Sequence, residues 1–235
     1  MVREEIEAVT IIKGNGNWWW AGSLQQGFLW LKLQNTSSSD LVLIINDDTE
    51  FEADFLENAI NLMRGKDNTL LLSQCYSTQS GKFLGAGVHV NWRQLTFRTT
   101  DRPEEVNCLS TRGLFLSPSA FFMIGGFYPT LLPHYLSDYE FTIRAYRKGM
   151  KLLTDPSVRL RLDESTTGFH QFKSATFYQF LRNYFSIKSA ANPLAWTVFI
   201  TLACPWPWKI LNWSRVCGRT LHHSVIAFIK RKSVA

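Results

Sequence analysis

The chain has 235 residues, of which 46% are hydrophobic and 19% charged, enough apolar material for one large domain or one domain with an appendage. Its four cysteines lie far apart without a CxxC pair, which argues against a zinc site and a disulfide framework and favours a reducing compartment. The first residues, MVREEIEA, are charged and lack the apolar centre of a signal peptide.

The net charge of +6 is distributed unevenly along the chain. Residues 165–235 hold nine of the 25 Lys and Arg and none of the 19 Asp and Glu, so the preceding part has 16 basic against 19 acidic residues. The body is therefore slightly acidic and the tail strongly basic.

The first elements surround a run of three tryptophans. Residues 9–12 predict a short strand and residues 22–34 a helix. Between them, NGNWWWAG (15–22) suits neither a helix face nor a strand face, because both periodicities would expose at least one indole. Its Gly and Asn residues predict a loop.

The next elements alternate between strand and helix. Five aliphatic residues (41–45) predict a strand buried on both faces, as in parallel sheets covered by helices. Residues 51–67 predict a helix ended by Gly65, and residues 69–74 another apolar strand. This rhythm predicts an α/β fold with an open, mostly parallel sheet flanked by helices.

Shorter elements follow. Strand-like pieces lie around 88–90 and 95–97, and residues 112–127 predict a strand, a short helix and a Gly-Gly turn. SDYEFTIRAYRKGM (137–150) predicts a helix with Ser137 as N-cap and Gly149 just past its end.

Acidic residues follow the strand at 41–45. Ligands of open α/β sheets lie beyond the carboxyl ends of strands, where Asn46, Asp47 and Asp48 would stand. Oxygen ligands at this density suit Mg²⁺ or Mn²⁺, and such an ion suits a diphosphate. The alternative is that Asp48 or Thr49 only caps the following helix.

A second acidic cluster opens the helix at 137. Asp138 would lie at the first helical position, where the helix dipole keeps it ionised. An ionised carboxylate in a cleft can take the proton of a sugar hydroxyl. The alternative is a capping box in which Ser137 and Glu140 serve the helix end alone.

Four segments resemble a known family in order and spacing: GNGNWWWAGSLQQG, LVLIINDDTEFEADFL, TRGLFLSPSAFFMIGGF and LPHYLSDYEFTIRAYRKG. Over about residues 9–170 the chain resembles a family 2 glycosyltransferase with the GT-A fold, of the bacterial cell-surface polysaccharide type. The resemblance implies inverting transfer of a sugar (a hexosyl-type reaction) from a nucleotide-diphosphate sugar to an acceptor hydroxyl, on a glycan or a lipid-linked acceptor, in cell-surface glycan biosynthesis.

The resemblance also implies roles for particular residues. Asp138 matches the catalytic base, Asp48 the metal-binding aspartate for Mg²⁺ or Mn²⁺, and His170 stands where relatives place a metal- or phosphate-contacting histidine. Contacts to the nucleotide sugar fall to Asn46, Asp47, Trp18, Trp19 and Gly22. Tryptophan suits a sugar-binding wall because it combines area with an N–H donor; at least one indole is expected to cover the sheet edge instead.

The chain departs from the family at its start. Members begin with a PTYN-like strand and carry a later DGS segment, and both are missing here, so the chain opens at what would be the third strand. Such a sheet would expose an edge and half a nucleotide site. The alternative function is therefore an inactive glycosyltransferase fragment that binds a membrane or a partner enzyme.

The sequence divides into a glycosyltransferase-like domain (1–170) and a helical tail (171–235). Residues 189–208 carry no charge, but three prolines interrupt them, which favours an interfacial helix over a membrane span. With its tryptophans and cations, the tail predicts a cytoplasmic protein peripheral to the inner face of the cell membrane, on anionic lipid. The alternatives are a helical pair packed on the domain and nucleic-acid binding, which the spread of the cations disfavours.

Four further residues have weaker expectations. His134 is placed to approach the acceptor, and Arg112 to approach the diphosphate. Arg144 is expected to serve the helix C-terminus, and the role of Gln25 stays open.

Overall fold

The computed structural model describes residues 9–100, 102–163 and 176–232. The helices within them are α2 (Trp19–Leu31), α3 (Phe55–Met63), α4 (Pro118–Ile124), α5 (Ser137–Arg147), α6 (Phe177–Tyr184), α7 (Pro193–Ala203) and α8 (Trp206–Lys232), with a 3-10 turn at Pro103–Glu105. The strands are β1 (Val42–Ile44), β2 (Thr49–Phe51), β3 (Thr69–Ser77), β4 (Phe83–Gly85), β5 (Gly87–Asn91), β6 (Thr96–Thr100), β7 (Leu114–Leu116) and β8 (Lys151–Leu162).

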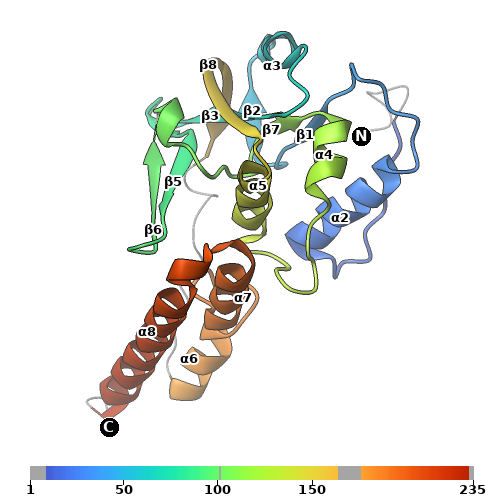
Figure 1. Ribbon diagram of the computed structural model, residues 1–235. Helices are drawn as coiled ribbons and strands as arrows, with labels where there is room; N and C mark the ends of the chain where they lie inside the picture. Colours follow the sequence, from blue (N-terminus) through green and yellow to red (C-terminus); the bar gives the residue numbers. More distant parts are fainter. Residues whose placement is uncertain (1–8, 101, 164–175, 233–235) are drawn as a thin grey trace.

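A mixed sheet forms the centre of the molecule (Figure 1). Its strand order is β1-β7-β3-β8-β2, and β4 pairs with β3. Among the described strands of this sheet, β3 and β8 are parallel, whereas all other pairs are antiparallel. The predicted α/β class is confirmed, but the predicted mostly parallel sheet is wrong.

Helices cover both faces of the sheet, as the apolar runs predicted. Alternate residues of β3 point to opposite sides: Leu70 and Leu72 pack with α2, α4 and α5, whereas Leu71 packs with α3. Figure 1 shows α3 separated by the sheet from α2 and α4. An unbroken apolar strand thus indicates that both faces of the sheet are covered. It does not indicate whether the neighbouring strands run parallel or antiparallel, which is why the predicted parallel pairing was wrong.

The strand predicted at 41–45 forms as β1 and lies at one edge of this sheet. β1 pairs with β7 in antiparallel register, from Val42 opposite Leu116 to Ile44 opposite Leu114. Ile44 is buried, while Val42 and Leu43 are half-buried, in keeping with an edge position. The strand that we expected at 9–12 does not form.

The first helix begins earlier than predicted. Trp19 already belongs to α2, so the tryptophan run is a helix start and not a loop. Gly22 permits this, because a Cβ there would lie 3.0 Å from the Cβ of Trp18. The ends of three other helices agree with the prediction: the glycines that follow α3, α4 and α5 (Gly65, Gly125 and Gly149) have positive φ, as expected of glycines that end helices.

The longest strand, β8, was not predicted. Pro156 and several charged residues interrupt its sequence, and its register with β3 shifts between Ser73 and Gln74. Its buried side chains nevertheless alternate with exposed ones at Val158, Leu160 and Leu162.

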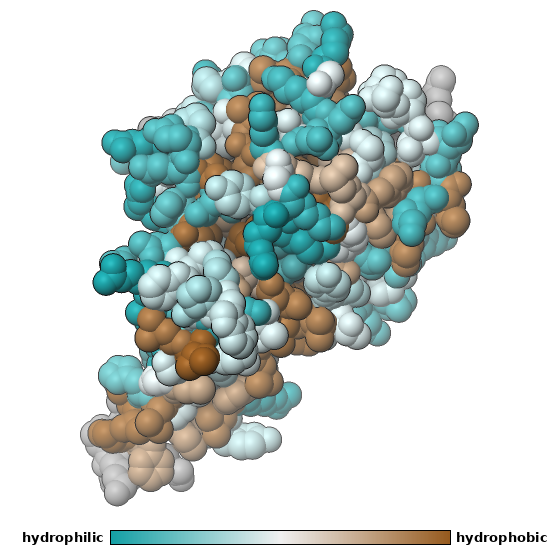
Figure 2. Space-filling model, viewed as in Figure 1, coloured by the Kyte–Doolittle hydropathy of each residue, from teal (hydrophilic) through white to brown (hydrophobic). Residues whose placement is uncertain are grey.

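The described part of the tail, residues 176–232, forms three helices at the lower end of the molecule (Figure 1). Phe199 of α7 is fully buried with Val88 of β5 and Ile143 of α5, so α7 belongs to the core of the fold. The outer part of α8 extends away, and Figure 2 shows apolar surface over this lower end. Within the described residues no helix combines the length and apolarity needed to cross a membrane.

Candidate active site

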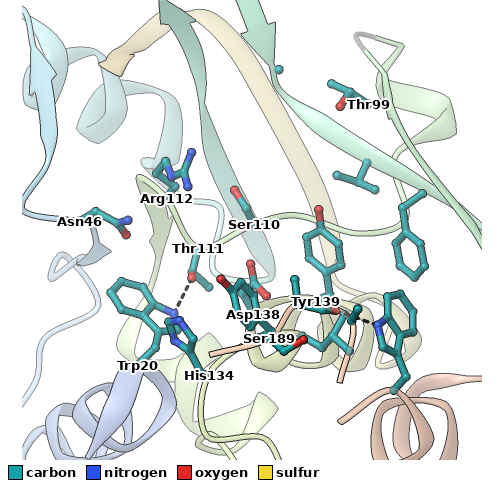
Figure 3. Close-up of a pocket in the computed structure, with 18 of the residues that line it drawn as sticks. Trp20, Asn46, Thr99, Ser110, Thr111, Arg112, His134, Asp138, Tyr139 and Ser189 are labelled. Atoms are coloured by element: carbon teal, nitrogen blue, oxygen red, sulfur yellow. Dashed lines mark hydrogen bonds between the residues drawn. The ribbon is translucent and has the colours of Figure 1, made fainter. Parts of the chain in front are cut away.

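A pocket of about 1110 Å³ opens between the sheet, the β5–β6 hairpin and the tail. It is large for a small-molecule site, since typical ligand pockets measure about 300–1,000 Å³. Figure 3 shows Asp138 near its centre, with Asn46 and Arg112 to one side and Tyr139 to the other. The pocket therefore combines a carboxylate, a cation and several hydroxyl groups in one space.

Asp138 lies in the first turn of α5, as the sequence predicted. Burial raises its pKa from 3.8 to about 6, opposed by hydrogen bonds from the backbone N–H groups of Tyr139 and Asp138 and by the charge of Arg112. The carboxyl group is therefore mostly ionised at pH 7 while remaining a stronger base than an exposed aspartate. This is the state that proton acceptance requires.

The predicted capping box does not form. Leu136 takes the N-cap position in a left-handed conformation (φ 69°), and the hydroxyl of Ser137 donates a hydrogen bond to the carbonyl of His134 at 2.6 Å. This bond ties the turn before α5 to the helix start. Because Ser137 precedes Asp138 directly, the bond also restrains the backbone at Asp138.

Glu140 and Arg144 form a separate structural clamp. The guanidinium of Arg144 binds both carboxylate oxygens of Glu140 at 2.9 Å and donates to the carbonyls of Ile124, Gly125 and Gly126. Glu140 is only 4% exposed and is not part of the pocket. Glu140 is therefore a partner in this ion pair. Arg144 serves the C-terminal carbonyls of α4 and not those of its own helix, so it holds α5 to the Gly-Gly turn after α4.

Arg112 is presented by a tightly fixed turn before β7. Gly113 follows it with φ 76°, donates its N–H to the carbonyl of Ile44 at 2.9 Å, and accepts bonds from the N–H and hydroxyl of Ser73 at 3.0 and 2.8 Å. The turn is thus bonded to β1 and β3 at once. Arg112 lines the pocket as a result, beside Asp138 and Cys75.

We expect Gly113→Ala to lower the free energy of unfolding by about 2–4 kcal/mol, combining left-handed strain with overpacking. A Cβ there would lie 2.4 Å from Leu160 and 2.7 Å from the Ser73 hydroxyl. Gly81→Ala is the matched control, because Gly81 has φ 65° and nothing within 4 Å of the added Cβ. Urea denaturation of both variants checks this. Equal losses would show that Gly113 is needed for its φ angle alone.

The acidic residues that follow β1 lie in a turn between β1 and β2. Asn46 lines the pocket, Asp47 and Asp48 are exposed beside it, and the hydroxyl of Thr49 donates to the Asn46 carbonyl at 2.7 Å. The alternative that Asp48 or Thr49 caps the next helix is wrong, because β2 intervenes and α3 starts after Asp54. The two carboxylates therefore have no capping role in α3.

The turn between β1 and β2 offers carboxylates for a divalent ion that a bound substrate would also coordinate. Among the described residues, no group of three His, Cys, Asp or Glu side chains is placed to hold a metal. Mg²⁺, however, is commonly held by one or two carboxylates, water and the phosphates of a substrate. Asp47 and Asp48 suit a site of this shared kind, and Asn46 joins it to the pocket. His170 lies outside the described residues.

One tryptophan of the three reaches the pocket. Trp20 lines it, and its indole N–H donates to the hydroxyl of Thr111 at 3.2 Å (Figure 3). Trp18 packs against Gly22, which donates its N–H to the Trp18 carbonyl at 3.0 Å. Trp19 is 38% exposed, with its ring centroid 5.9 Å from that of His134. Trp18, Trp19 and Gly22 thus support the helix start, while Trp20 contributes the wall.

Other residues with open roles have clear positions. His134 lines the pocket, as its expected approach to an acceptor requires. Gln25 does not: its carbonyl oxygen accepts the N–H of Phe127 at 2.7 Å, which joins α2 to the turn that Arg144 holds from the other side. The role of Gln25 is structural.

The tail also contributes to the pocket, which the sequence did not predict. Tyr184 of α6 and Val216, Arg219 and His223 of α8 line its outer part. The ring centroids of Tyr184 and His223 are 5.9 Å apart. No pattern within the tail signals this arrangement, because it depends on how α8 folds back beside α7.

The chain matches no family model and no curated protein. Among solved structures it is similar to the crystal structure of GalNAc-T7 with UDP, GalNAc and Mn²⁺, at 12% identity and a TM-score of 0.47. The match covers 79% of this chain and 38% of that one, so the chain spans well under half the length of that glycosyltransferase.

Proposed function

We propose that this chain carries the catalytic base and part of the diphosphate site of an inverting glycosyltransferase that uses a nucleotide-diphosphate sugar. One observation carries the proposal: the Asp138 carboxylate, with its pKa raised to about 6, shares a pocket with Asn46, at the end of β1, and with Arg112. The motif resemblance to family 2 glycosyltransferases, with a role in cell-surface glycan biosynthesis, supports the same reading.

The reaction follows from these positions. Asp138 accepts the proton of the acceptor hydroxyl as its oxygen attacks the anomeric carbon of the donor. The new bond joins acceptor oxygen to anomeric carbon, and the bond from that carbon to the phosphate oxygen breaks, its electron pair leaving with the nucleoside diphosphate. Attack opposite the leaving group inverts the anomeric centre. No covalent intermediate with the protein forms.

The leaving diphosphate needs positive charge nearby. Arg112 supplies a guanidinium on the pocket wall, and the preceding residues Ser110 and Thr111 add hydroxyl groups. A Mg²⁺ or Mn²⁺ ion held by Asp48 and Asp47 with the diphosphate would supply further charge neutralisation. Trp20 and His134 offer flat surface for a sugar ring.

We expect the purified chain to release nucleoside diphosphate from a panel of nucleotide-diphosphate sugars in the presence of Mn²⁺ or Mg²⁺. Asp48→Asn should reduce this release at least about tenfold, because losing a charged contact costs about 1.5–3 kcal/mol. Glu50→Gln removes an exposed carboxylate two residues away and should leave the release unchanged. The assay is chromatographic detection of the diphosphate, with an EDTA arm.

Two results would contradict the proposal. If neither excess EDTA nor the Asp48→Asn substitution reduced the release of diphosphate, neither the metal nor Asp48 would take part in the reaction. A folded chain without affinity for any nucleotide sugar in calorimetry would favour the alternative, a glycosyltransferase fragment that acts as a binding module.

A further inference from the structure

Helix α8 has an exposed apolar face along most of its 27 residues. Its inner side packs on the fold: Asn212 is fully buried and Val216 is 6% exposed. Its outer side carries Ile210 and Leu221, which are 70% and 67% exposed, and further exposed apolar residues, Leu211, Val225 and Ile229. Contiguous apolar surface of this kind on a soluble protein marks a contact site.

The helical repeat shows that this surface is one continuous face. At about 100° per residue, Ile210, Leu211, Leu221, Val225 and Ile229 fall within a sector about 120° wide, together with Ser214, Cys217 and Gly218. The sector is uncharged over about 29 Å of helix. We name these eight residues the outer face of α8.

The charge carried by α8 has one sign, and Arg215 lies about 40° from the edge of the outer face. Residues 176–232 contain eight Lys and Arg and no Asp or Glu, and six of the eight are on α8: Lys209, Arg215, Arg219, Lys230, Arg231 and Lys232. Trp206, at the start of the same helix, is 76% exposed. An uncharged face on a helix that carries cations, no carboxylates and an exposed indole at its start is the pattern of a helix that lies in a membrane interface.

We propose that the outer face of α8 docks on an anionic lipid surface, with the helix lying in the plane of the interface. Charge complementarity selects this occupant over a second copy of the chain, because pairing two such faces would bring cations together without carboxylates to offset them. No described helix meets the requirements of a membrane span, so shallow insertion is the form of contact that fits.

Docking would hold the pocket about one helix diameter, some 10–12 Å, above the lipid contact. The opposite side of the same helix carries the pocket-lining Val216, Arg219 and His223. The outer face and the pocket are thus two sides of one rigid element. The head group of an acceptor anchored in lipid would then stand at the level of the pocket, beside α8. The docking itself does not depend on the proposed reaction and is tested without an activity assay.

The experiment is sedimentation of the full chain with phosphatidylcholine vesicles, with and without about 30% phosphatidylglycerol, across a salt series. We expect binding to the anionic vesicles that falls at least about tenfold between about 0.1 and 0.5 M NaCl. The double variant Leu221→Glu/Val225→Glu should lose binding. Leu33→Glu, at a residue 84% exposed beyond the end of α2, is the matched control and should bind normally.

A second variant separates charge from apolar contact and does not alter the outer face between Ile210 and Ile229. Replacing Lys230, Arg231 and Lys232 by Gln should weaken binding to anionic vesicles by about 100-fold, from the loss of three cations. Salt-insensitive binding, equal binding to neutral vesicles, or no binding at all would each overturn the proposal. So would dimers in analytical ultracentrifugation that Leu221→Glu/Val225→Glu dissociates, because a second copy would then cover the face.

Discussion

Asp138→Asn is expected to reduce turnover by about 10²–10⁴-fold while leaving the affinity for the nucleotide sugar nearly unchanged. The amide keeps the shape of the carboxyl group but cannot accept the proton of the acceptor. Steady-state kinetics with calorimetric donor binding checks both parts. The nearest alternative base on the helix, Glu140, is bound on both oxygens by Arg144, so Glu140 offers no bypass. A variant that keeps most of its turnover would contradict the assignment.

The same residue predicts two pH effects. Because the pKa of Asp138 is about 6, kcat/KM should rise with pH through about 6 and then level off. A pKa raised above its unfolded value of 3.8 means that the folded state holds the proton more tightly. The free energy of unfolding therefore falls as pH rises from about 4 to about 6.

Asp138→Asn should remove this stability loss. At pH 7 we expect the variant to be more stable than the parent by about 1–2 kcal/mol, a value reduced for solvent screening because Asp138 is half-buried on the pocket wall. Urea titrations at pH 4 and pH 7 measure the difference. A variant of lower stability at pH 7 would show that the carboxylate makes a structural contact that the asparagine does not replace.

Arg144→Ala is expected to lower the free energy of unfolding by about 3–5 kcal/mol, because it leaves the Glu140 carboxylate buried without its partner. The side chains of Arg144 and Glu140 are 16% and 5% exposed, and the same guanidinium satisfies three carbonyls of the turn after α4. Thermal and urea unfolding measure the loss. The lost contacts join α5 to α4, so the effect should extend to the position of Asp138.

Two variants test the origin of that loss. Arg147→Ala removes an exposed arginine one turn away, which donates a 3.3 Å hydrogen bond to the carbonyl of Leu202, and should cost under about 1 kcal/mol. Arg144→Lys keeps the charge but loses the bidentate geometry, so it should recover only part of the stability. Full recovery by lysine would show that charge alone holds the clamp.

Local chemistry in the sequence determined most of the elements. Apolar runs at β3 and β7, the periodicity of α3 and α5, and helix-ending glycines such as Gly65 and Gly149 act within a few residues, so a single sequence shows them. The sequence also placed Asp138 in the first turn of α5, although the N-cap is Leu136 and not Ser137. That both faces of the sheet are covered followed from strands without polar positions.

Tertiary structure decided the rest, because it depends on partners far apart in the chain. The antiparallel pairing of β1 with β7 is set across about seventy residues, and identical apolar runs fit either direction. Glu140 became a clamp partner because the carbonyls of the α4 turn meet Arg144 beside it. Trp20 lines the pocket, where its indole N–H is held by the hydroxyl of Thr111. Arg219 and His223 reach the pocket because α8 folds back along α7. Sequence thus determines which groups are present, while packing determines which of them share a pocket.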